Sequence, residues 1–229
     1  MAGAPGERPL RHHRVDLNAA IERVRNRIAD AGGDSESMTL VAVTKGHGAD
    51  AVRAALAAGL HDVGENFAQE LAAKADDIDD RDDPRWHFIG QVQRNKVRLV
   101  AHRVSLWQSV DRLTVGAEIA KRSPGAAVLV QVNLSDDPAR GGAKPELAPG
   151  VVEGVRDLGL DVRGLMAVGP PGGPDAARAG FRAVRAIADR LELPVRSMGM
   201  SDDLEIAVQE GSTMLRIGTA LFGSRPRVA

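Results

Sequence analysis

One lysine stands at the end of a short apolar run, where its amine could act as a nucleophile. The run Leu40-Val41-Ala42-Val43-Thr44 leads directly into Lys45, and Gly46-His47-Gly48 follows. Its length and β-branched content are typical of a buried strand. Alternation along a strand then places Lys45 on the face of Val41 and Val43. Such a lysine either buries only its stem and keeps its ammonium in water, or is desolvated and condenses with an aldehyde.

Two segments near the C-terminus could hold a phosphate group. Each passes from an expected strand into an expected helix, and each offers free backbone N–H groups, small residues and a hydroxyl. The segments are Ser197-Met198-Gly199-Met200-Ser201-Asp202-Asp203 and Arg216-Ile217-Gly218-Thr219. The alternative is ordinary helix capping, with Ser201 or Asp202 as the N-cap and Glu205 completing a capping box from Asp202. The residues alone leave both interpretations open.

Strands and helices alternate along the chain, which indicates how these residues are positioned. A first helix is expected from residue 15 to Gly32, and helices or helical turns follow each strand. The eight expected strands cover residues 40–45, 62–66, 86–90, 104–110, 127–134, 162–168, 195–200 and 213–217. This alternation predicts βαβ units and a parallel sheet.

The predicted fold is α/β, a single (β/α)₈ TIM-like barrel preceded by an N-terminal helix. Eight units in 229 residues leave no room for a second domain. An open doubly wound sheet would want a G-x-G-x-x-G fingerprint after the first strand, and Gly46-His47-Gly48 lacks that spacing. We expect residues 1–14 to form a disordered lead-in and residues 15–229 to form the barrel domain.

A barrel collects the ends of its strands at one mouth, where active sites of this fold lie. Arg216 shares the face of Gly218, and its guanidinium either pairs with a carboxylate at the barrel end or donates to a ligand heteroatom. Asn66 and His87 close two further strands, as loop caps or as pocket walls. The fold therefore predicts that Lys45 meets these residues and the phosphate segments at one mouth.

Composition excludes several classes of protein. The net charge is −1 with acids and bases interspersed, so no overall field recruits nucleic acid or an anionic membrane. The chain has no cysteine, which removes disulfides and thiolate sites, and we expect no metal site. No apolar stretch approaches bilayer length, and residues 1–14 lack the apolar segment of a secretory signal. A cytoplasmic location is the expectation.

With these motifs assembled, the chain resembles the pyridoxal-phosphate homeostasis protein family, also called the YggS or proline-synthase co-transcribed family. The matching segments run in the family's order from the first helix to Gly223. They are Val41-Ala42-Val43-Thr44-Lys45, Gly64-Glu65-Asn66, Trp86-His87-Phe88-Ile89-Gly90-Gln91 with Asn95-Lys96, Ser197-Met198-Gly199-Met200-Ser201-Asp202-Asp203, and Gly211-Ser212-Thr213-Met214-Leu215-Arg216-Ile217-Gly218-Thr219-Ala220-Leu221-Phe222-Gly223.

The resemblance implies a barrel like the N-terminal domain of alanine racemase, carrying pyridoxal 5′-phosphate (PLP) as a covalent imine on Lys45. It also implies that Ser201, Gly218 and Thr219 hold the phosphate and that Arg216 faces the pyridine nitrogen. Three more residues complete the expected cofactor-binding set, namely Asn66, His87 and Met200. Two departures from the family pattern are Gly46-His47-Gly48 after the lysine and Phe67 where a tyrosine is usual.

The family is thought to hold and buffer PLP rather than to catalyse strongly, and two features of the chain agree. Arginine does not give up its proton, so it leaves the pyridine nitrogen unprotonated and the ring a weaker electron sink. Racemases of this fold class use a tyrosine from a second domain as one of two bases, and this chain has no tyrosine. We therefore expect a PLP carrier, as a monomer or weak dimer, with PLP-dependent apo-enzymes as candidate recipients.

Two other activities remain open at this stage. One is a weak amino-acid racemase or another PLP-dependent enzyme of fold type III. The other is a Schiff-base aldolase that takes a sugar phosphate and needs no cofactor.

Overall fold

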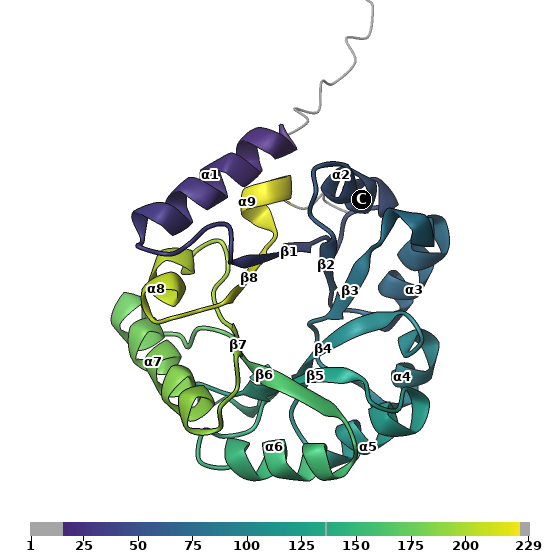
Figure 1. Ribbon diagram of the computed structural model, residues 1–229, viewed down its shortest axis with the longest axis vertical. Helices are drawn as coiled ribbons and strands as arrows, with labels where there is room; N and C mark the ends of the chain where they lie inside the picture. The colour runs from purple at the N-terminus through teal and green to yellow at the C-terminus, as the bar shows by residue number, and fades with distance from the viewer. Residues whose placement is uncertain (1–15, 136, 225–229) are drawn as a thin grey trace, which may run out of the picture.

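Eight parallel strands pair in sequence order and close into a barrel (Figure 1), because β1 pairs with both β2 and β8. The computed structural model describes residues 16–135 and 137–224. The predicted barrel is confirmed, while the lead-in expected over residues 1–14 lies outside the described residues. The strands are β1 Thr39–Val43, β2 Asp62–Glu65, β3 Arg85–Phe88, β4 Val104–Val110, β5 Ala127–Val132, β6 Asp161–Ala167, β7 Val195–Ser197 and β8 Met214–Ile217.

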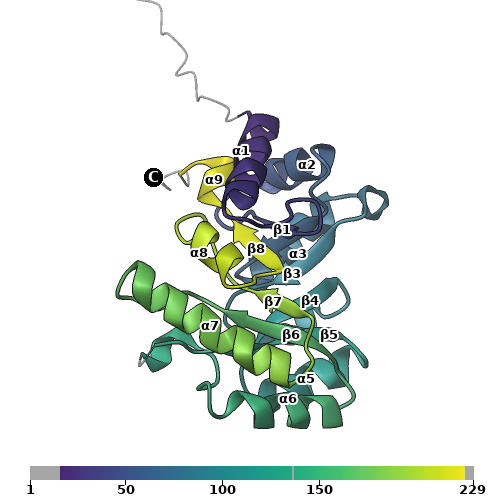
Figure 2. The same ribbon diagram turned by 60° about the vertical axis from the view of Figure 1, so that its left-hand side comes forward.

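The helices surround the strands on the outside of the barrel (Figures 1 and 2). They are α1 Leu17–Asp30, α2 Ala49–Ala57, α3 Ala68–Asp77, α4 Arg94–Val100, α5 Leu113–Arg122, α6 Ala148–Asp157, α7 Pro174–Arg190, α8 Leu204–Gln209 and α9 Thr219–Phe222, with 3₁₀ turns at Asp80–Asp82 and Pro138–Arg140. Within the described part of the chain, none is long and apolar enough to cross a membrane.

Helix α1 completes the outer layer where α9 is too short to do so. Asp16 caps its first turn, accepting a hydrogen bond from the backbone N–H of Ala19 at 3.2 Å. Ile21, Val24 and Ile28 recur at helical spacing and are buried, each contributing about 1.5–3 kcal/mol relative to exposure. The helix lies beside α8 and α9 (Figures 1 and 2). Helix α1 therefore supports the strand-to-helix turns that follow β7 and β8.

Several strands end before the residue that the sequence predicts, and at β1 and β7 the difference changes where candidate site residues lie. Strand β1 ends at Val43, and Lys45 lies in a turn in which Gly46 has φ +74°. Strand β7 ends at Ser197, and the chain then turns at Gly199, which has φ +93°. Positive φ suits glycine, which has no Cβ to clash. Lys45 and Ser201 therefore lie on turns rather than within strands, whereas Arg216 lies within β8.

The interior of the barrel is filled by side chains from alternate strand positions. Val41, Leu106, Leu129, Met166 and Met214 form one buried apolar cluster inside it. Glycine allows close approach of neighbouring strands. At Gly164 in β6, a Cβ would lie 1.9 Å from the carbonyl oxygen of Val195 in β7.

Gly164→Ala should lower the free energy of unfolding by about 1–3 kcal/mol, because the β6–β7 pair has to separate to admit the methyl group. Gly150→Ala is the matched control, since no atom lies within 4 Å of its added Cβ and it sits in α6. That change should stabilise by about 0.5–1 kcal/mol. Urea unfolding of both variants checks this, and equal effects would contradict the close approach.

Candidate functional site

A cavity of about 240 Å³ opens at the carboxyl ends of the strands. Its lining includes every residue expected from the sequence to bind a cofactor except His87. The lining residues are Val43, Lys45, Asn66, Ile89, Val168, Met200, Ser201, Asp202, Arg216, Gly218 and Thr219. The structure thus brings together the amine, the guanidinium and both strand-to-helix turns.

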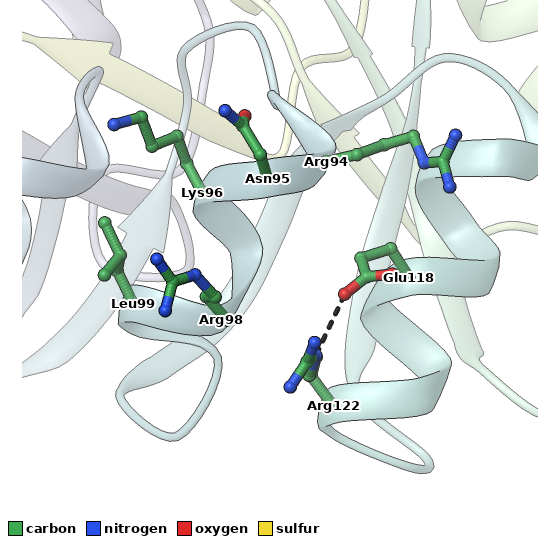
Figure 3. A pocket seen from close by; sticks show the side chains of 7 residues that line it. All are labelled: Arg94, Asn95, Lys96, Arg98, Leu99, Glu118 and Arg122. Atoms are coloured by element: carbon green, nitrogen blue, oxygen red, sulfur yellow. Dashed lines mark hydrogen bonds and ion pairs between the residues drawn. The ribbon is translucent and has the colours of Figure 1, made fainter.

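A larger groove of about 490 Å³ lies elsewhere, on the outer wall between α4 and α5 (Figure 3). It is lined by Arg94, Lys96 and Arg98, with Arg122 paired to Glu118 at 2.9 Å. These are side chains of the outer helices, and the groove includes none of the strand-end residues. The cavity at the mouth is therefore the candidate site.

Arg216 is the charged group buried at the base of this cavity, with 4% of its surface exposed. Its Nη1 donates to the carbonyl oxygen and to Oγ of Ser197, both at 2.7 Å, and Nη2 donates to the carbonyl oxygen of Ala167 at 2.8 Å. Burial lowers the pKa of Arg216 to about 10, so the guanidinium stays charged at neutral pH. Among the described residues no carboxylate forms an ion pair with it, so the salt bridge considered from the sequence is not present.

Asn66 presents an unsatisfied acceptor in the same cavity. Its Oδ1 is buried and has no hydrogen-bond partner in the protein. Leaving such an oxygen unpaired costs about 1–3 kcal/mol. Gly90 holds the Asn66 backbone closely, since a Cβ there would lie 2.1 Å from the Asn66 carbonyl oxygen. A ligand with an O–H or N–H donor fits this position, and the charged arginine and the lysine beside it fit an anionic aldehyde such as PLP.

The two turns after β7 and β8 form another part of the cavity rim. Ser201 Oγ accepts a hydrogen bond from the backbone N–H of Ala220 at 3.2 Å, which ties the turns together. Helix α9 begins at Thr219, whose side chain is exposed beside the cavity. Met200 also lies on this rim, 36% exposed.

The capping box considered for this region is not formed. The N-cap of α8 is Asp203, and it makes no side-chain capping bond. Its Oδ1 instead accepts from the backbone N–H of Met200 at 2.6 Å. Glu205 binds the guanidinium of Arg27 at 2.6 and 2.9 Å, which joins α8 to α1. The carboxylates of Asp203 and Glu205 therefore have structural partners other than the helix N-terminus.

A buried ionic cluster fixes the backbone on both sides of Lys45. Lys74 Nζ donates to the carbonyl oxygen of Thr44 at 2.8 Å, and the backbone N–H of Gly46 donates to Glu70 at 2.6 Å. Lys74 also binds Glu65 at 2.5 Å and Glu70 at 2.8 Å. Burial raises the pKa of Glu65, although Lys74 and Thr44 oppose that shift. The turn that carries Lys45 is thus held from behind by α3.

Lys74→Met should lower the free energy of unfolding by about 3–5 kcal/mol, because it removes a cation from the fully buried Glu65. Adding Glu65→Gln to that variant should recover part of the loss. Arg122→Met, which breaks the ion pair on the outer wall, should cost much less. Denaturant unfolding checks the series, and a loss no larger than that of Arg122→Met would contradict the role of the cluster.

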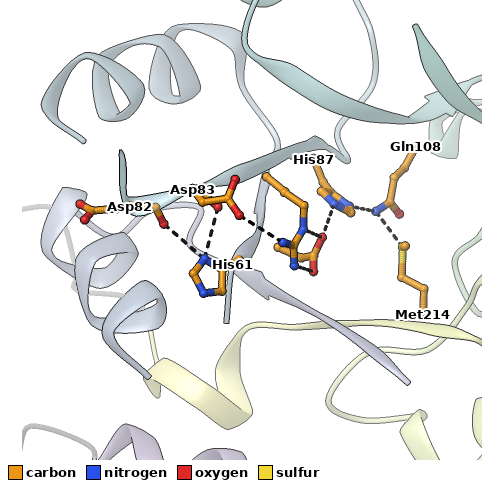
Figure 4. Close-up of polar contacts among 8 residues, drawn as sticks. His61, Asp82, Asp83, His87, Gln108 and Met214 are labelled. Carbon is orange, nitrogen blue, oxygen red and sulfur yellow. Dashed lines mark hydrogen bonds and ion pairs between the residues drawn. The ribbon is translucent and has the colours of Figure 1, made fainter. Parts of the chain in front are cut away.

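His87 lies one layer below the cavity, inside the barrel. It is 3% exposed, and Ile89, two residues later on the same face, is the one that reaches the cavity. Its Nδ1 lies 2.6 Å from Gln108 Nε2 (Figure 4). Its Nε2 lies 3.0 Å from Asp62 Oδ1. The structure therefore does not place His87 among the cavity-lining residues.

Burial and hydrogen bonding act on the pKa of Asp62 in opposite directions. Burial opposes its ionisation, but hydrogen bonds from His87 and Arg85 outweigh that effect and hold the pKa of Asp62 well below its usual range. A carboxyl whose pKa is depressed by folding contributes stability above its unfolded pKa, about 3.9, and that stability is lost as pH falls towards the folded value.

Asp62→Asn should therefore lower the free energy of unfolding most at neutral pH, and the difference from wild type should shrink below about pH 4. Asp161→Asn is the control, because Asp161 also begins a strand and pairs with an arginine, but at the surface. Urea unfolding at a series of pH values measures both. A difference independent of pH would contradict the ionic role of Asp62.

Sequence reasoning did not find Ile89 and Val168, which line the cavity walls, or the cluster around Glu65 and Lys74. The inward phase of the strand ends could have indicated the first two. The i,i+4 spacing of Glu70 and Lys74 was a signal for part of the cluster. His47 belongs to the segment Gly46-His47-Gly48 that departs from the family pattern. Its ring packs against that of Phe222 in α9, with the ring centroids 5.5 Å apart.

Comparison with known proteins identifies the family. Residues 15–226 match the family described as "Alanine racemase, N-terminal domain". Curated relatives named "Pyridoxal phosphate homeostasis protein" include one from Pseudomonas aeruginosa, 43% identical over 211 residues (89% of this chain, 91% of the relative). Another, from Escherichia coli, is 36% identical over 230 residues (92% of this chain, 97% of the relative).

Solved structures with the same fold include a member of this family and an alanine racemase. PipY of Synechococcus elongatus, solved with PLP bound, superposes with a TM-score of 0.77 at 33% identity, covering 87% of this chain and 100% of PipY. Alanine racemase of Corynebacterium glutamicum shares the fold, with a TM-score of 0.69 at 20% identity over 93% of this chain and 62% of the racemase. The chain belongs to the pyridoxal phosphate homeostasis protein family, built on the alanine racemase N-terminal barrel.

Proposed function

We propose that this protein binds PLP in the cavity at the strand ends and that Lys45 holds it as a reversible Schiff base. The observation that carries the proposal is that Lys45, the buried Arg216 and the two strand-to-helix turns line one cavity. The names of the curated relatives and the PLP-bound PipY structure support the choice of ligand. Forming the Schiff base joins the lysine nitrogen to the aldehyde carbon and releases water.

The expected cofactor-binding residues that line the cavity each have a role that suits their chemistry. Ser201 and Thr219 supply hydroxyls, and Gly218 and its neighbours supply backbone N–H groups, for the phosphate. Arg216 faces the pyridine nitrogen as a donor, which leaves that nitrogen unprotonated. Asn66 and Met200 complete the walls. His87 is not included in this proposal.

We infer that the protein acts as a carrier in PLP homeostasis in the cytoplasm. A free aldehyde modifies amines indiscriminately, and bonding to Lys45 masks it until an apo-enzyme accepts it. The bound cofactor supplies an electron sink, but the chain has no tyrosine to serve as the second base of a racemase. Turnover of D- or L-alanine well above that of free PLP would instead favour a weak racemase.

Lys45→Ala should abolish the yellow absorbance band that wild type develops with PLP, because no amine remains in the cavity to bond the aldehyde. Lys96→Ala, which changes a lysine of the outer groove, should keep the band. Visible spectra with and without added PLP decide the matter. A colourless wild type that is trapped by borohydride only with a carbonyl substrate would favour the aldolase.

Thr219→Val should weaken PLP retention by about 1 kcal/mol, because it removes a hydroxyl donor to the phosphate while preserving shape. Thr114→Val is the control, an exposed threonine of α5 outside the cavity. Equilibrium dialysis against PLP measures both variants. Unchanged retention in Thr219→Val would argue against its phosphate role.

A further inference from the structure

A chain of hydrogen bonds runs down the inside of the barrel from the cavity to the opposite end. Arg216 Nη1 donates to Ser197 Oγ at 2.7 Å, and Ser197 Oγ donates to Gln108 Oε1 at 2.6 Å. Gln108 Nε2 lies 2.6 Å from His87 Nδ1 (Figure 4). His87 Nε2 lies 3.0 Å from Asp62 Oδ1. Ser197, Gln108 and His87 are all at most 3% exposed, so water does not compete for these bonds.

The two ends fix the direction of every bond in the chain. A guanidinium only donates and an ionised carboxylate only accepts. Ser197 accepts from Arg216, so its own hydrogen is available to Gln108, whose amide oxygen must face it. The amide nitrogen of Gln108 then faces His87 Nδ1, which has to be an acceptor. His87 therefore carries its proton on Nε2, towards Asp62.

We propose that Gln108 is a positioning residue for Arg216, acting through Ser197. Each group in the chain turns its acceptor end towards Arg216 and its donor end towards Asp62, so the aligned dipoles stabilise a buried cation that has no carboxylate in contact. Gln108 orients the Ser197 hydroxyl so that a lone pair faces the guanidinium. Its effect on ligand binding rests on the proposed function, in which Arg216 faces the PLP ring nitrogen.

The first test needs no PLP. Nitrogen-15 NMR of the unliganded protein, above the titration range of histidine, reports the tautomer of His87, whose signals are assigned by their loss in His87→Asn. Wild type should carry the proton on Nε2. In Gln108→Glu the group facing Nδ1 becomes an acceptor, so His87 should carry protons on both nitrogens. A wild-type proton on Nδ1 would overturn the proposed direction of these hydrogen bonds.

The second test measures PLP affinity. Gln108→Met keeps the length of the side chain but neither accepts from Ser197 nor donates to His87, and should weaken PLP binding about tenfold. Gln131→Met is the matched control. Gln131 is a buried glutamine of β5 whose side chain donates to the carbonyl oxygen of Arg140, and it takes no part in the hydrogen bonds between Arg216 and Asp62. It should change affinity less than about twofold. In Gln108→Met the ring-nitrogen signal of ¹⁵N-labelled PLP should also shift, and in Gln131→Met it should not.

The outcomes separate the two proposals. If wild type does not bind PLP, the proposed function fails. The His87 tautomer then still decides whether the hydrogen bonds from Arg216 to Asp62 run in the proposed direction. If wild type binds and Gln108→Met matches Gln131→Met in affinity and in the ring-nitrogen signal, the positioning role is wrong. Should Gln108→Met fail to fold, Gln108→Asn keeps the amide but is one methylene too short to bridge Ser197 and His87, and it should give the same tenfold loss.

Discussion

Closure of the barrel between its first and last strands is the constraint on which the site depends. Strand β1 pairs with β8 in parallel register, with Val41 opposite Arg216 and Ala42 opposite Ile217. Because parallel strands end at the same edge, this pairing brings the turn of Lys45 beside the turn of Gly218 and Thr219, although about 170 residues of chain separate them. Any shift of this register would separate the amine from the rim proposed to hold the phosphate.

The mouth is held by two separate polar systems, one on each side of the strand layer. Outside the barrel, Lys74 and Glu70 fix the peptide groups that flank Lys45. Inside, the carbonyl oxygens of Ala167 and Ser197 hold the guanidinium of Arg216. Buried charges are costly unless they are paired or hydrogen-bonded, and both systems meet that condition with partners from several elements. The reactive groups are therefore positioned by buried polar contacts rather than by apolar packing alone.

Much of this arrangement was predictable because the alternation of strands and helices is local information. Strand β4 has the expected bounds, and the barrel determines which strand ends meet. The partners of buried charges were not predictable, because Glu65 meets Lys74 only after α3 packs against β2. The depth of His87 also depends on tertiary structure. Strand phase indicates that it points inward, but only the stagger between strands places it below the cavity.

The central claim is that Lys45 is the residue that bonds the ligand, and peptide mapping tests it most directly. Wild type loaded with PLP is reduced with borohydride, digested and examined by mass spectrometry. The pyridoxyl group should be found on the peptide that contains Lys45. A stoichiometric label on Lys74, Lys96, Lys121 or Lys144 instead, or no label on any lysine, would contradict the account.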